Sequence, residues 1–253
     1  MSRYQGSKYK MRNVLKEVIE SHLTKDTTYV EPFSGGCNSL AYIDAEKKLA
    51  SDTNKYMIAL WDEIKQGTFQ FPETVSEEMY YDVKKNYLAG TGKYSDATIG
   101  YIATNCSYGS SWFGGYAHYN PKKNEDHIKE AKNGFLRQIK NFINLQNTTF
   151  KCCGYNELDI PEKSFIYCDP PYAETKKYTN DFNSHAFYQW CRDMINKGHI
   201  ILMSEYSAPH DFIMIWEKEM QDGMGSVNKK KTEKLFVHQS QAHLFKQYTK
   251  QVA

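Results

Sequence analysis

The sequence predicts an α/β fold in which a parallel sheet is encoded by two separate stretches of the chain, with a helical insertion between them. Three observations lead to this prediction. Short β-rich segments alternate with helical segments near the start of the chain, and a Gly-rich turn follows the first strand. The sequence then shows little buried-strand pattern from about residue 66 to residue 150. Strand-like segments resume with a continuous apolar run at residues 164–168, which is typical of a central parallel strand.

The first stretch of the core is predicted from its periodicity. Apolar side chains at a spacing of three and four residues predict helices, and β-branched or aromatic residues predict strands. Pro32 and the pair Gly35-Gly36 form the turn after the first strand. The predicted elements are a helix over 11–23, a strand over 28–31, a helix over 38–48, a strand over 49–52 and a helix over 55–66.

The insertion is polar, mainly helical and rich in basic residues. Its most unusual part is a loop of glycine, serine and aromatic residues at 106–120, which several lysines and an arginine follow. The elements predicted after it are a strand over 164–168, a helix over 184–197 and a strand over 199–204. We therefore assign residues 1–62 and 151–253 to a core and residues 63–150 to an inserted domain.

The composition is that of a globular protein and excludes several classes. The chain has 253 residues, 40% of them hydrophobic and 25% charged, with a net charge of +2, which argues against disordered and fibrous proteins. No run of about 18 apolar residues occurs, so we expect no transmembrane helix. The basic N-terminal residues lead into no apolar signal segment, so we expect an intracellular protein. The six cysteines show no metal-ligand spacing, so we expect reduced thiols and no structural metal.

The first candidate site is the turn at residues 31–36, Glu-Pro-Phe-Ser-Gly-Gly. Its glycines allow the backbone to approach a ligand closely, although a plain turn after a strand would explain them equally well. Asp52, at the end of the next predicted strand, favours a ligand, because an acidic residue there can accept hydrogen bonds from the ribose of an adenosine. The turn has no lysine to hold phosphates. This argues against a triphosphate and fits S-adenosylmethionine.

The second candidate site is residues 169–172, Asp-Pro-Pro-Tyr, directly after the apolar run. Two prolines cannot continue a sheet, so the chain must turn at the edge where α/β folds bind ligands. A carboxylate and a proline carbonyl can both accept hydrogen bonds from an exocyclic amine, and an aromatic ring can stack on the attached heterocycle. The alternative is a turn that merely ends the strand.

The order of these two motifs resembles that of the amino-methyltransferases that modify DNA bases. Residues 33–36, the insertion and residues 169–172 follow one another as in the alpha group, which includes the Dam-like DNA adenine methyltransferases of bacteria and phages. The sequence departs from the family pattern at Tyr4, where tryptophan is usual, and at Ser7, where a second glycine is usual. Further similar segments are the N-terminal element with Tyr4, Gly6 and Lys8, residues 52–54 and residues 182–187.

The resemblance implies a Rossmann-like, S-adenosylmethionine-dependent methyltransferase core with an inserted, mainly helical DNA-recognition domain. It implies methyl transfer from that cofactor to the N6 amine of an adenine flipped out of a short, specific sequence of double-stranded DNA. Asp169 and the Pro170 carbonyl would hold the amine, and Tyr172 would stack on the adenine. The cofactor-binding residues that it implies are Tyr4, Lys8, Phe33, Gly35, Asp52, Tyr155 and Asp169.

The insertion would then recognise the DNA sequence. Its Lys and Arg side chains would contact phosphates, and Asn120 or Gln138 would meet base edges. A solvated helical lid is the alternative interpretation. The expected DNA-binding residues are Tyr116, Asn120, Lys122, Arg137 and Gln138, and residues 229–231, three lysines, are expected in a flexible, solvated loop. The expected partner is double-stranded DNA, without a membrane, for a monomer or weak dimer in the cytoplasm of a bacterial cell.

Three other functions are open to the same residues. A methyltransferase of a protein glutamine amide uses a similar turn, but usually with asparagine at the place of Asp169. Cytosine-N4 methylation is a second alternative, although serine is commoner there. A DNA-binding protein without catalysis is a third, against which the presence of both Asp52 and Asp169 argues.

Overall fold

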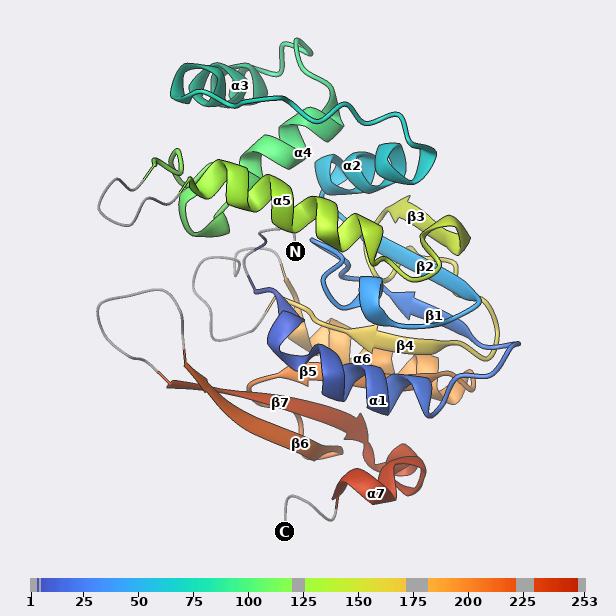
Figure 1. Cartoon of the computed structure of the whole chain (residues 1–253). Coiled ribbons are helices and arrows are strands. Elements are labelled where there is room, and N and C mark those ends of the chain that lie inside the picture. The colour runs from blue at the N-terminus through green and yellow to red at the C-terminus, as the bar shows by residue number, and fades with distance from the viewer. Residues whose placement is uncertain (1–3, 5, 120–125, 172–181, 222–229, 250–253) are drawn as a thin grey trace.

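The computed structural model describes the chain except for residues 1–3, 5, 120–125, 172–181, 222–229 and 250–253. Its described part contains a seven-stranded sheet with helices on both faces (Figure 1). The strands are β1 (Thr28–Glu31), β2 (Lys47–Asp52), β3 (Thr148–Cys152), β4 (Phe165–Cys168), β5 (Ile200–Glu205), β6 (Phe212–Gln221) and β7 (Lys230–His238). The α-helices are α1 (Arg12–Glu20), α2 (Lys55–Gln66), α3 (Glu77–Ala89), α4 (Asp96–Asn105), α5 (His127–Lys140), α6 (Ser184–Asn196) and α7 (Lys246–Thr249). Short 3-10 helices lie at Lys8–Met11, Leu40–Tyr42, Tyr108–Ser110, Leu145–Asn147 and Gln239–Phe245.

The strand order β3-β2-β1-β4-β5-β7-β6 confirms the predicted α/β fold with a Rossmann-like core. Neighbours from β3 to β5 are parallel, whereas β7 is antiparallel to both β5 and β6. The chain builds outward from β1 through β2 to β3, and then returns to the other side of β1 with β4. In such sheets, ligands bind at the carboxyl ends of the strands where the order reverses, which here are β1 and β4.

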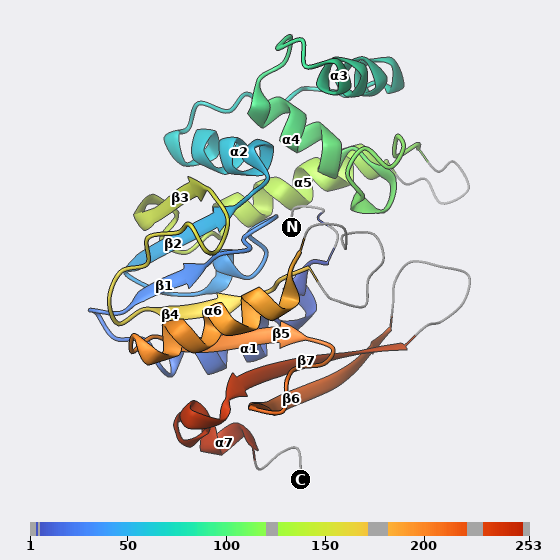
Figure 2. The same cartoon turned by 180° about the vertical axis from the view of Figure 1, so that it is seen from behind.

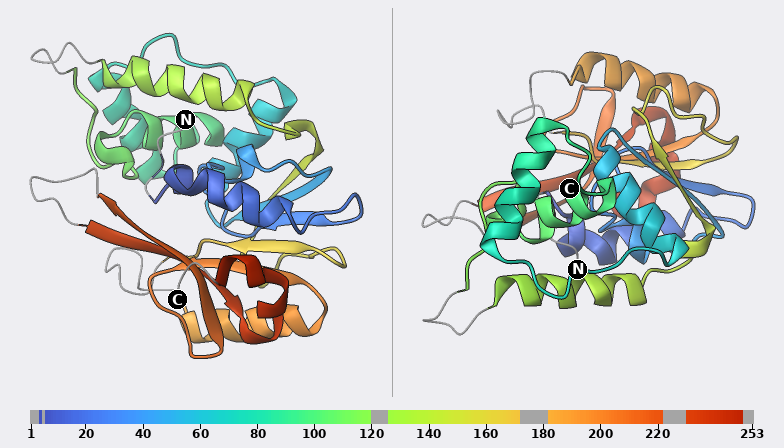
Figure 3. Two further views of the ribbon diagram at one scale, coloured as in Figure 1. Left: turned by 60° about the horizontal axis from the view of Figure 1, so that its bottom comes forward. Right: turned by 90° about the horizontal axis from the view of Figure 1, so that it is seen from above.

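Helices cover the two faces of the sheet unequally. Helix α1 lies in front of the sheet in Figure 1, and α6 lies on the opposite face, as the reverse view in Figure 2 shows. Helices α2 to α5 gather beyond β2 and β3, and the β6–β7 hairpin with α7 lies at the opposite end (Figure 3). No helix within the described ranges is both long and apolar enough to cross a membrane.

The insertion shares its hydrophobic core with the sheet. Trp61 of α2 is fully buried, and its ring centre lies 5.2 Å from that of Phe135 in α5 and 6.4 Å from that of Phe150 in β3. Helix α2 and strand β3 also run across the predicted boundaries at 62–63 and 150–151. The described part of the insertion is mainly helical, but a division of the chain at those two places stays a prediction.

The prediction of a helix over 38–48 is wrong. The structure has only the 3-10 turn Leu40–Tyr42 there, and β2 already begins within that range. The Ile143 N–H donates to the Ala41 carbonyl at 3.0 Å, and Lys48 Nζ donates to the carbonyls of Leu40 at 2.8 Å and of Ile143 at 2.7 Å. These long-range bonds occupy carbonyl groups that a continued helix would need for its own backbone.

The hairpin of β6 and β7 was not predicted. Residues 230 and 231, which were expected in a flexible loop, begin strand β7, while residue 229 lies outside the described residues. Strand β7 pairs with β5 only between Lys234 and Phe236, but it pairs with β6 along its whole length. An apolar strand signal is therefore confined to the second half of β7, and the lysine-rich first half gives none.

Candidate active site

The carboxyl ends of β1, β2 and β4 bring the predicted motifs together. Strand β1 ends at Glu31 and leads into residues 32–37, which we call the glycine loop. Strand β2 ends at Asp52, and Asp169 follows the last residue of β4. Because these strands are parallel neighbours, their ends lie side by side, and we call this region the carboxyl edge. Two motifs that are far apart in the sequence therefore meet at one edge of the sheet.

The glycine loop is fixed by its backbone and by a neighbouring ring. The Ser34 N–H donates to the Ser51 carbonyl at 2.9 Å, and the Gly35 N–H donates to Asp52 Oδ2 at 2.8 Å. Gly35 has a φ of +43°, and a Cβ added to it would lie only 2.6 Å from Cε1 of Tyr4. A larger residue at position 35 would displace the tyrosine ring, so Tyr4 and Gly35 form one contact, and the cofactor-binding role predicted for both stays a prediction.

Asp52 holds the loop and keeps acceptor capacity. Its Oδ2 accepts from Gly35, and its Oδ1 accepts from the Asn54 N–H at 2.9 Å. Burial raises the pKa of Asp52, while these two backbone hydrogen bonds act in the opposite direction. A carboxylate has about four acceptor positions. The two backbone N–H groups occupy two of these positions, so the others can accept hydrogen bonds from the hydroxyl groups of a sugar.

Asp169 faces a buried ammonium group. Lys8 Nζ lies 3.0 Å from Asp169 Oδ1 and 3.6 Å from Oε2 of Glu233 in β7. Burial lowers the pKa of Lys8, but the carboxylates of Asp169 and Glu233 raise it more, so the pKa lies above its ordinary value. The charged Lys8 thus connects the N-terminal segment, the end of β4 and β7. Glu233 had no signal in the sequence that would place it at this site.

Aromatic rings line the same region. The ring centre of Phe33, in the glycine loop, lies 5.5 Å from that of Tyr155 and 5.6 Å from that of Phe187 in α6. Tyr155 lies 5.4 Å from Phe187 and 5.2 Å from Trp190. Phe33 and Tyr155 are half-buried, whereas Phe187 is fully buried. The exposed parts of the first two rings form an apolar surface on which a flat heterocycle can stack.

Glu31 is a further carboxyl group of this edge to which sequence reasoning assigned no role. It is 2% exposed and accepts hydrogen bonds from the hydroxyl groups of Tyr29 and Ser39. Burial raises the pKa of Glu31 to about 8, and burial likewise lowers the pKa of Lys48 to about 8. The signal that could have found Glu31 is its position, since an acidic residue ends a buried strand directly before a glycine turn.

The charge of the region suits a cationic ligand. Carboxyl groups end or follow four neighbouring strands, β2, β1, β4 and β5, and a fifth lies half-buried on β7. They belong to Glu31, Asp52, Asp169, Glu205 and Glu233. Glu31, with its pKa raised to about 8, is largely protonated at pH 7. The other four carboxyl groups outnumber the one ammonium group of Lys8, so the region attracts a ligand that carries net positive charge. A sulfonium compound with an amino group is such a ligand.

Comparison with known families decides which reaction the chain catalyses. A family model described as D12 class N6 adenine-specific DNA methyltransferase matches residues 4–249. The chain belongs to this family. It is an enzyme that methylates adenine in DNA at N6, and its family implies S-adenosylmethionine as the methyl donor. The predicted methylation of adenine in DNA at N6 is confirmed, and adenine is favoured over the cytosine and glutamine alternatives.

Three relatives found by sequence similarity agree with this assignment. A DNA adenine methylase of Vibrio cholerae is 29% identical over 202 residues, which cover 73% of this chain and 68% of that protein. A DNA adenine methylase of Escherichia coli is 27% identical over 202 residues, which cover 71% of this chain and 69% of that protein. The type II methyltransferase M.FokI of Planomicrobium okeanokoites is 25% identical over 205 residues, which cover 75% of this chain and 31% of that protein. An rRNA methylase structure from Streptococcus thermophilus aligns with a TM-score of 0.36 and 9% identity, covering 89% of this chain and 95% of that one.

In the structure of this chain, most of the predicted cofactor-binding and catalytic residues lie at the carboxyl edge. Tyr4 touches Gly35, Gly35 binds Asp52, Lys8 binds Asp169, and Phe33 meets Tyr155. Pro170 follows Asp169 directly and is buried. Tyr172 lies outside the described residues. The contacts bring these residues together, and the roles assigned to them stay predictions.

The predicted DNA-binding residues differ in how far they are exposed, and two of them lie outside the described residues. Asn120 and Lys122 lie outside the described residues, and Arg137 is exposed on α5. Tyr116 is half-buried, and its hydroxyl group donates to the Val75 carbonyl at 2.7 Å. The structure corrects the prediction for Gln138. Its side chain is 1% exposed, and Nε2 donates to the carbonyls of Gly36 and Cys37, so it does not lie where a base edge could meet it.

Proposed function

We propose that the carboxyl edge binds S-adenosylmethionine and an adenine flipped out of double-stranded DNA, and that methylation occurs within a short specific sequence. The observation that carries this proposal is the place of the glycine loop. It follows β1, the strand between β2, which Asp52 ends, and β4, which Asp169 and Pro170 follow. An adenosine-binding element and an amine-binding element are thus held by adjacent strands. A methyl donor and a methyl acceptor need this arrangement.

The cofactor would lie over the glycine loop. The remaining acceptor positions of Asp52 suit ribose hydroxyl groups, and the rings of Phe33 and Tyr155 suit the adenine. Glu31 and Lys8 supply charged or ionisable groups for the amino acid end. S-adenosylmethionine would supply an activated methyl group on a sulfonium, which becomes a neutral thioether when the methyl group leaves.

Asp169 and Pro170 would hold the target amine. Both the carboxylate and the proline carbonyl accept hydrogen bonds, so the two N–H groups of an adenine amine can be bound at once. This arrangement turns the nitrogen lone pair out of conjugation and toward the methyl carbon. The N–C bond would then form as the C–S bond of the cofactor breaks, and the nitrogen would release one proton to the surrounding water, leaving a neutral methylamino group and a neutral thioether. The Lys8 ammonium, 3.0 Å from Asp169 Oδ1, orients the carboxylate for this task.

An adenine in a duplex is accessible only after it leaves the stack. Flipping costs a few kcal/mol, and one aromatic stack contributes about 1–3 kcal/mol, so we propose that Tyr172 offsets much of that cost. The exposed basic side chains of α5, Lys129, Arg137 and Lys140, are candidates for phosphate contacts. Since the relatives are bacterial, we propose the bacterial cytoplasm, where such DNA lies, as the place of action.

The direct test maps the product on DNA. The purified protein is incubated with S-adenosylmethionine and unmethylated genomic DNA, and modified bases are located by single-molecule sequencing. N6-methyladenine confined to one short motif is the expected result. Methylation at cytosine, or scattered over all adenines, would refute the proposed specificity. Binding of the cofactor without any modified base would refute the proposed catalysis.

A further inference from the structure

Gln138 connects the insertion to the glycine loop. It belongs to the buried side of α5, together with Ala131 and Phe135. Its Nε2 donates to the Gly36 carbonyl and to the Cys37 carbonyl, each at 3.1 Å. Buried carbonyl groups that lose their donor are unfavourable. The amide of Gln138 therefore satisfies two successive acceptors of the loop from a helix more than 100 residues away in the sequence.

The part of the loop that Gln138 holds is strained. Cys37 has a φ of +51°, in the left-handed region that residues with a Cβ disfavour. Its N–H donates to the Ser34 carbonyl at 2.7 Å, and its carbonyl accepts from the Ala41 N–H at 3.1 Å as well as from Gln138. Strained backbone persists where several contacts impose it, and it occurs preferentially at ligand sites. Gln138 is one of the contacts that impose the shape of this loop.

The two halves of the loop are held from different sides. Ser34 and Gly35 are bonded to the end of β2 through Ser51 and Asp52, whereas Gly36 and Cys37 are bonded to α5. The core of the sheet fixes the first half. The second half is held by the bonds of Cys37 to Ser34 and Ala41 and, from a helix of the insertion, by Gln138. A loop that must fit a ligand closely therefore depends on how α5 lies against it.

We propose that Gln138 is a positioning residue for S-adenosylmethionine. It holds the second half of the glycine loop in the shape that binds the cofactor, so the position of α5 against the loop contributes to cofactor affinity. Gln138 acts through the loop backbone and is separate from the residues that would touch the cofactor. The inference rests on the proposed function, in which this loop binds the cofactor.

Lys132 provides a matched control on the same helix. Its Nζ donates to the Pro72 carbonyl at 2.6 Å and to the Glu73 carbonyl at 3.5 Å. It thus resembles Gln138 in tying α5 to two successive carbonyl groups. The segment that it ties belongs to the insertion itself. A general loosening of α5 would appear in variants of both residues, whereas a loss specific to the cofactor would appear only in variants of Gln138.

The experiment compares Gln138→Met with Lys132→Met. Methionine keeps a long side chain in both places and removes the donor. Binding of S-adenosylhomocysteine without DNA is measured by calorimetry, and thermal unfolding is recorded in parallel. We expect Gln138→Met to weaken binding about tenfold, which corresponds to about 1.4 kcal/mol, and Lys132→Met to change it by less than about twofold. Gln138→Lys, which restores an N–H donor, should recover part of the lost affinity.

Two results separate the failure of this inference from failure of the proposed function. Near-normal affinity in Gln138→Met, with a loss of thermal stability like that of Lys132→Met, would show that Gln138 only stabilises the fold. If the unaltered protein binds no S-adenosylhomocysteine, the proposed function itself is wrong.

A measurement on the unaltered protein covers the case in which Gln138→Met does not fold. Amide hydrogen exchange is followed by mass spectrometry with and without S-adenosylhomocysteine. The ligand should slow exchange in the peptide that covers residues 34–41 and in the one that covers residues 134–142, while residues 70–76 stay unchanged. Protection of the loop peptide without protection of the end of α5 would overturn the inference.

Discussion

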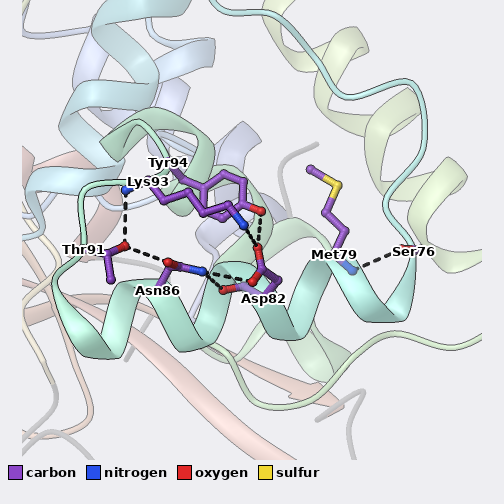
Figure 4. A network of polar contacts seen from close by, with 7 residues as sticks. All are labelled: Ser76, Met79, Asp82, Asn86, Thr91, Lys93 and Tyr94. Carbon is purple, nitrogen blue, oxygen red and sulfur yellow. Dashed lines mark hydrogen bonds and ion pairs between the residues drawn. The ribbon is translucent and has the colours of Figure 1, made fainter.

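Two lysine–aspartate pairs in this chain have the same chemistry and very different surroundings. Lys8 and Asp169 meet at the carboxyl edge, where their side chains are 7% and 22% exposed. Lys93 and Asp82 meet at the outer end of the insertion, where theirs are 54% and 36% exposed. Figure 4 shows Asp82 on α3 receiving hydrogen bonds from Lys93, Tyr94 and Asn86. The residues are alike, so burial and neighbours must decide what each pair does.

The comparison shows why a charged pair becomes a functional site in one place and a surface feature in the other. Around Asp82, water and salt screen the charges, and a shallow groove of about 580 Å³ beside α3 is open to solvent. Around Asp169, several further carboxyl groups are buried, and aromatic rings lie close by. Water and salt therefore screen the charges of the carboxyl edge less than those beside α3, so they can act more strongly on a ligand.

The largest expected effect separates the two aspartates by activity. Asp169→Ala removes the carboxylate that would hold the target amine, so the methylation rate should fall by at least about a hundredfold. DNA binding should be largely unchanged, because that carboxylate acts on the amine and leaves the phosphates alone. Initial rates with labelled S-adenosylmethionine, together with a DNA-binding assay, provide the measurement. Asp82→Asn, the matched control, should retain near-normal turnover.

A pair of glycines extends the comparison to the backbone. Gly35 and Gly90, which ends α3, both have a positive φ, but only Gly35 lies under a ring, that of Tyr4. Alanine costs about 1–2 kcal/mol in the left-handed region in either place. Gly35→Ala also displaces Tyr4, so cofactor affinity should fall by roughly tenfold or more. Calorimetric titration should show unchanged affinity for Gly90→Ala, and equal losses in the two variants would contradict the fit between Tyr4 and Gly35.

Local signals explain which elements the sequence predicted well. The helix over 55–66 was predicted with the bounds that it has, because Asn54 caps its start and Gly67, with a φ of +72°, ends it. The strand over 28–31 is likewise found where it was predicted. The two motifs of the carboxyl edge were recognisable because each consists of consecutive residues. Because β1, β2 and β4 are parallel, both motifs then lie at one edge of the sheet.

Long-range contacts explain what sequence reasoning missed. Glu233 reaches Lys8 from the other end of the chain, and no local pattern indicates that pairing. The stretch 38–48 has a helical composition, but the Ile143 N–H, after α5, binds the Ala41 carbonyl, and Lys48 Nζ binds the Leu40 carbonyl. Gln138 did have a usable signal, since it continues the buried stripe of Ala131 and Phe135 on α5. Its polarity suggested a DNA contact, whereas its position in the helix indicated burial.

The next prediction uses pH to tell buried from exposed carboxyl groups. Burial raises the pKa of Glu31 from 4.5 to about 8, so the folded protein keeps a proton that the unfolded chain releases. The contribution of this group to the free energy of unfolding is fully present below pH 4.5. It is lost as the pH rises from 4.5 through 8, with a slope of at most about 1.4 kcal/mol per pH unit. Glu31→Gln should remove this slope in denaturant titrations. The pKa of Lys48 is lowered from 10.5 to about 8, so Lys48 changes the slope of stability against pH only above the range in which Glu31 does.

Asp82 provides the opposite sign as a control for the pH experiment. Its hydrogen bond from Lys93 holds the pKa of Asp82 below the ordinary value of 3.8, so its contribution is lost only as the pH falls into the acid range. Between pH 5 and pH 8, Asp82→Asn should leave the slope of stability against pH as it is in the unaltered protein. A slope that survives in Glu31→Gln would assign the titration to another buried group.

The smallest expected effect concerns salt. Because the Lys93–Asp82 pair is exposed, Asp82→Asn should lower the midpoint of thermal unfolding by no more than about 2 °C, and the difference should nearly vanish in about 1 M salt. Lys8→Met removes a buried cation between two carboxylates, so its destabilisation should persist at the same salt concentration. Scanning calorimetry at low and high salt gives both differences. A large, salt-independent loss in Asp82→Asn would mean that the α3 network acts as a buried site does, and burial would no longer explain the contrast between the two pairs.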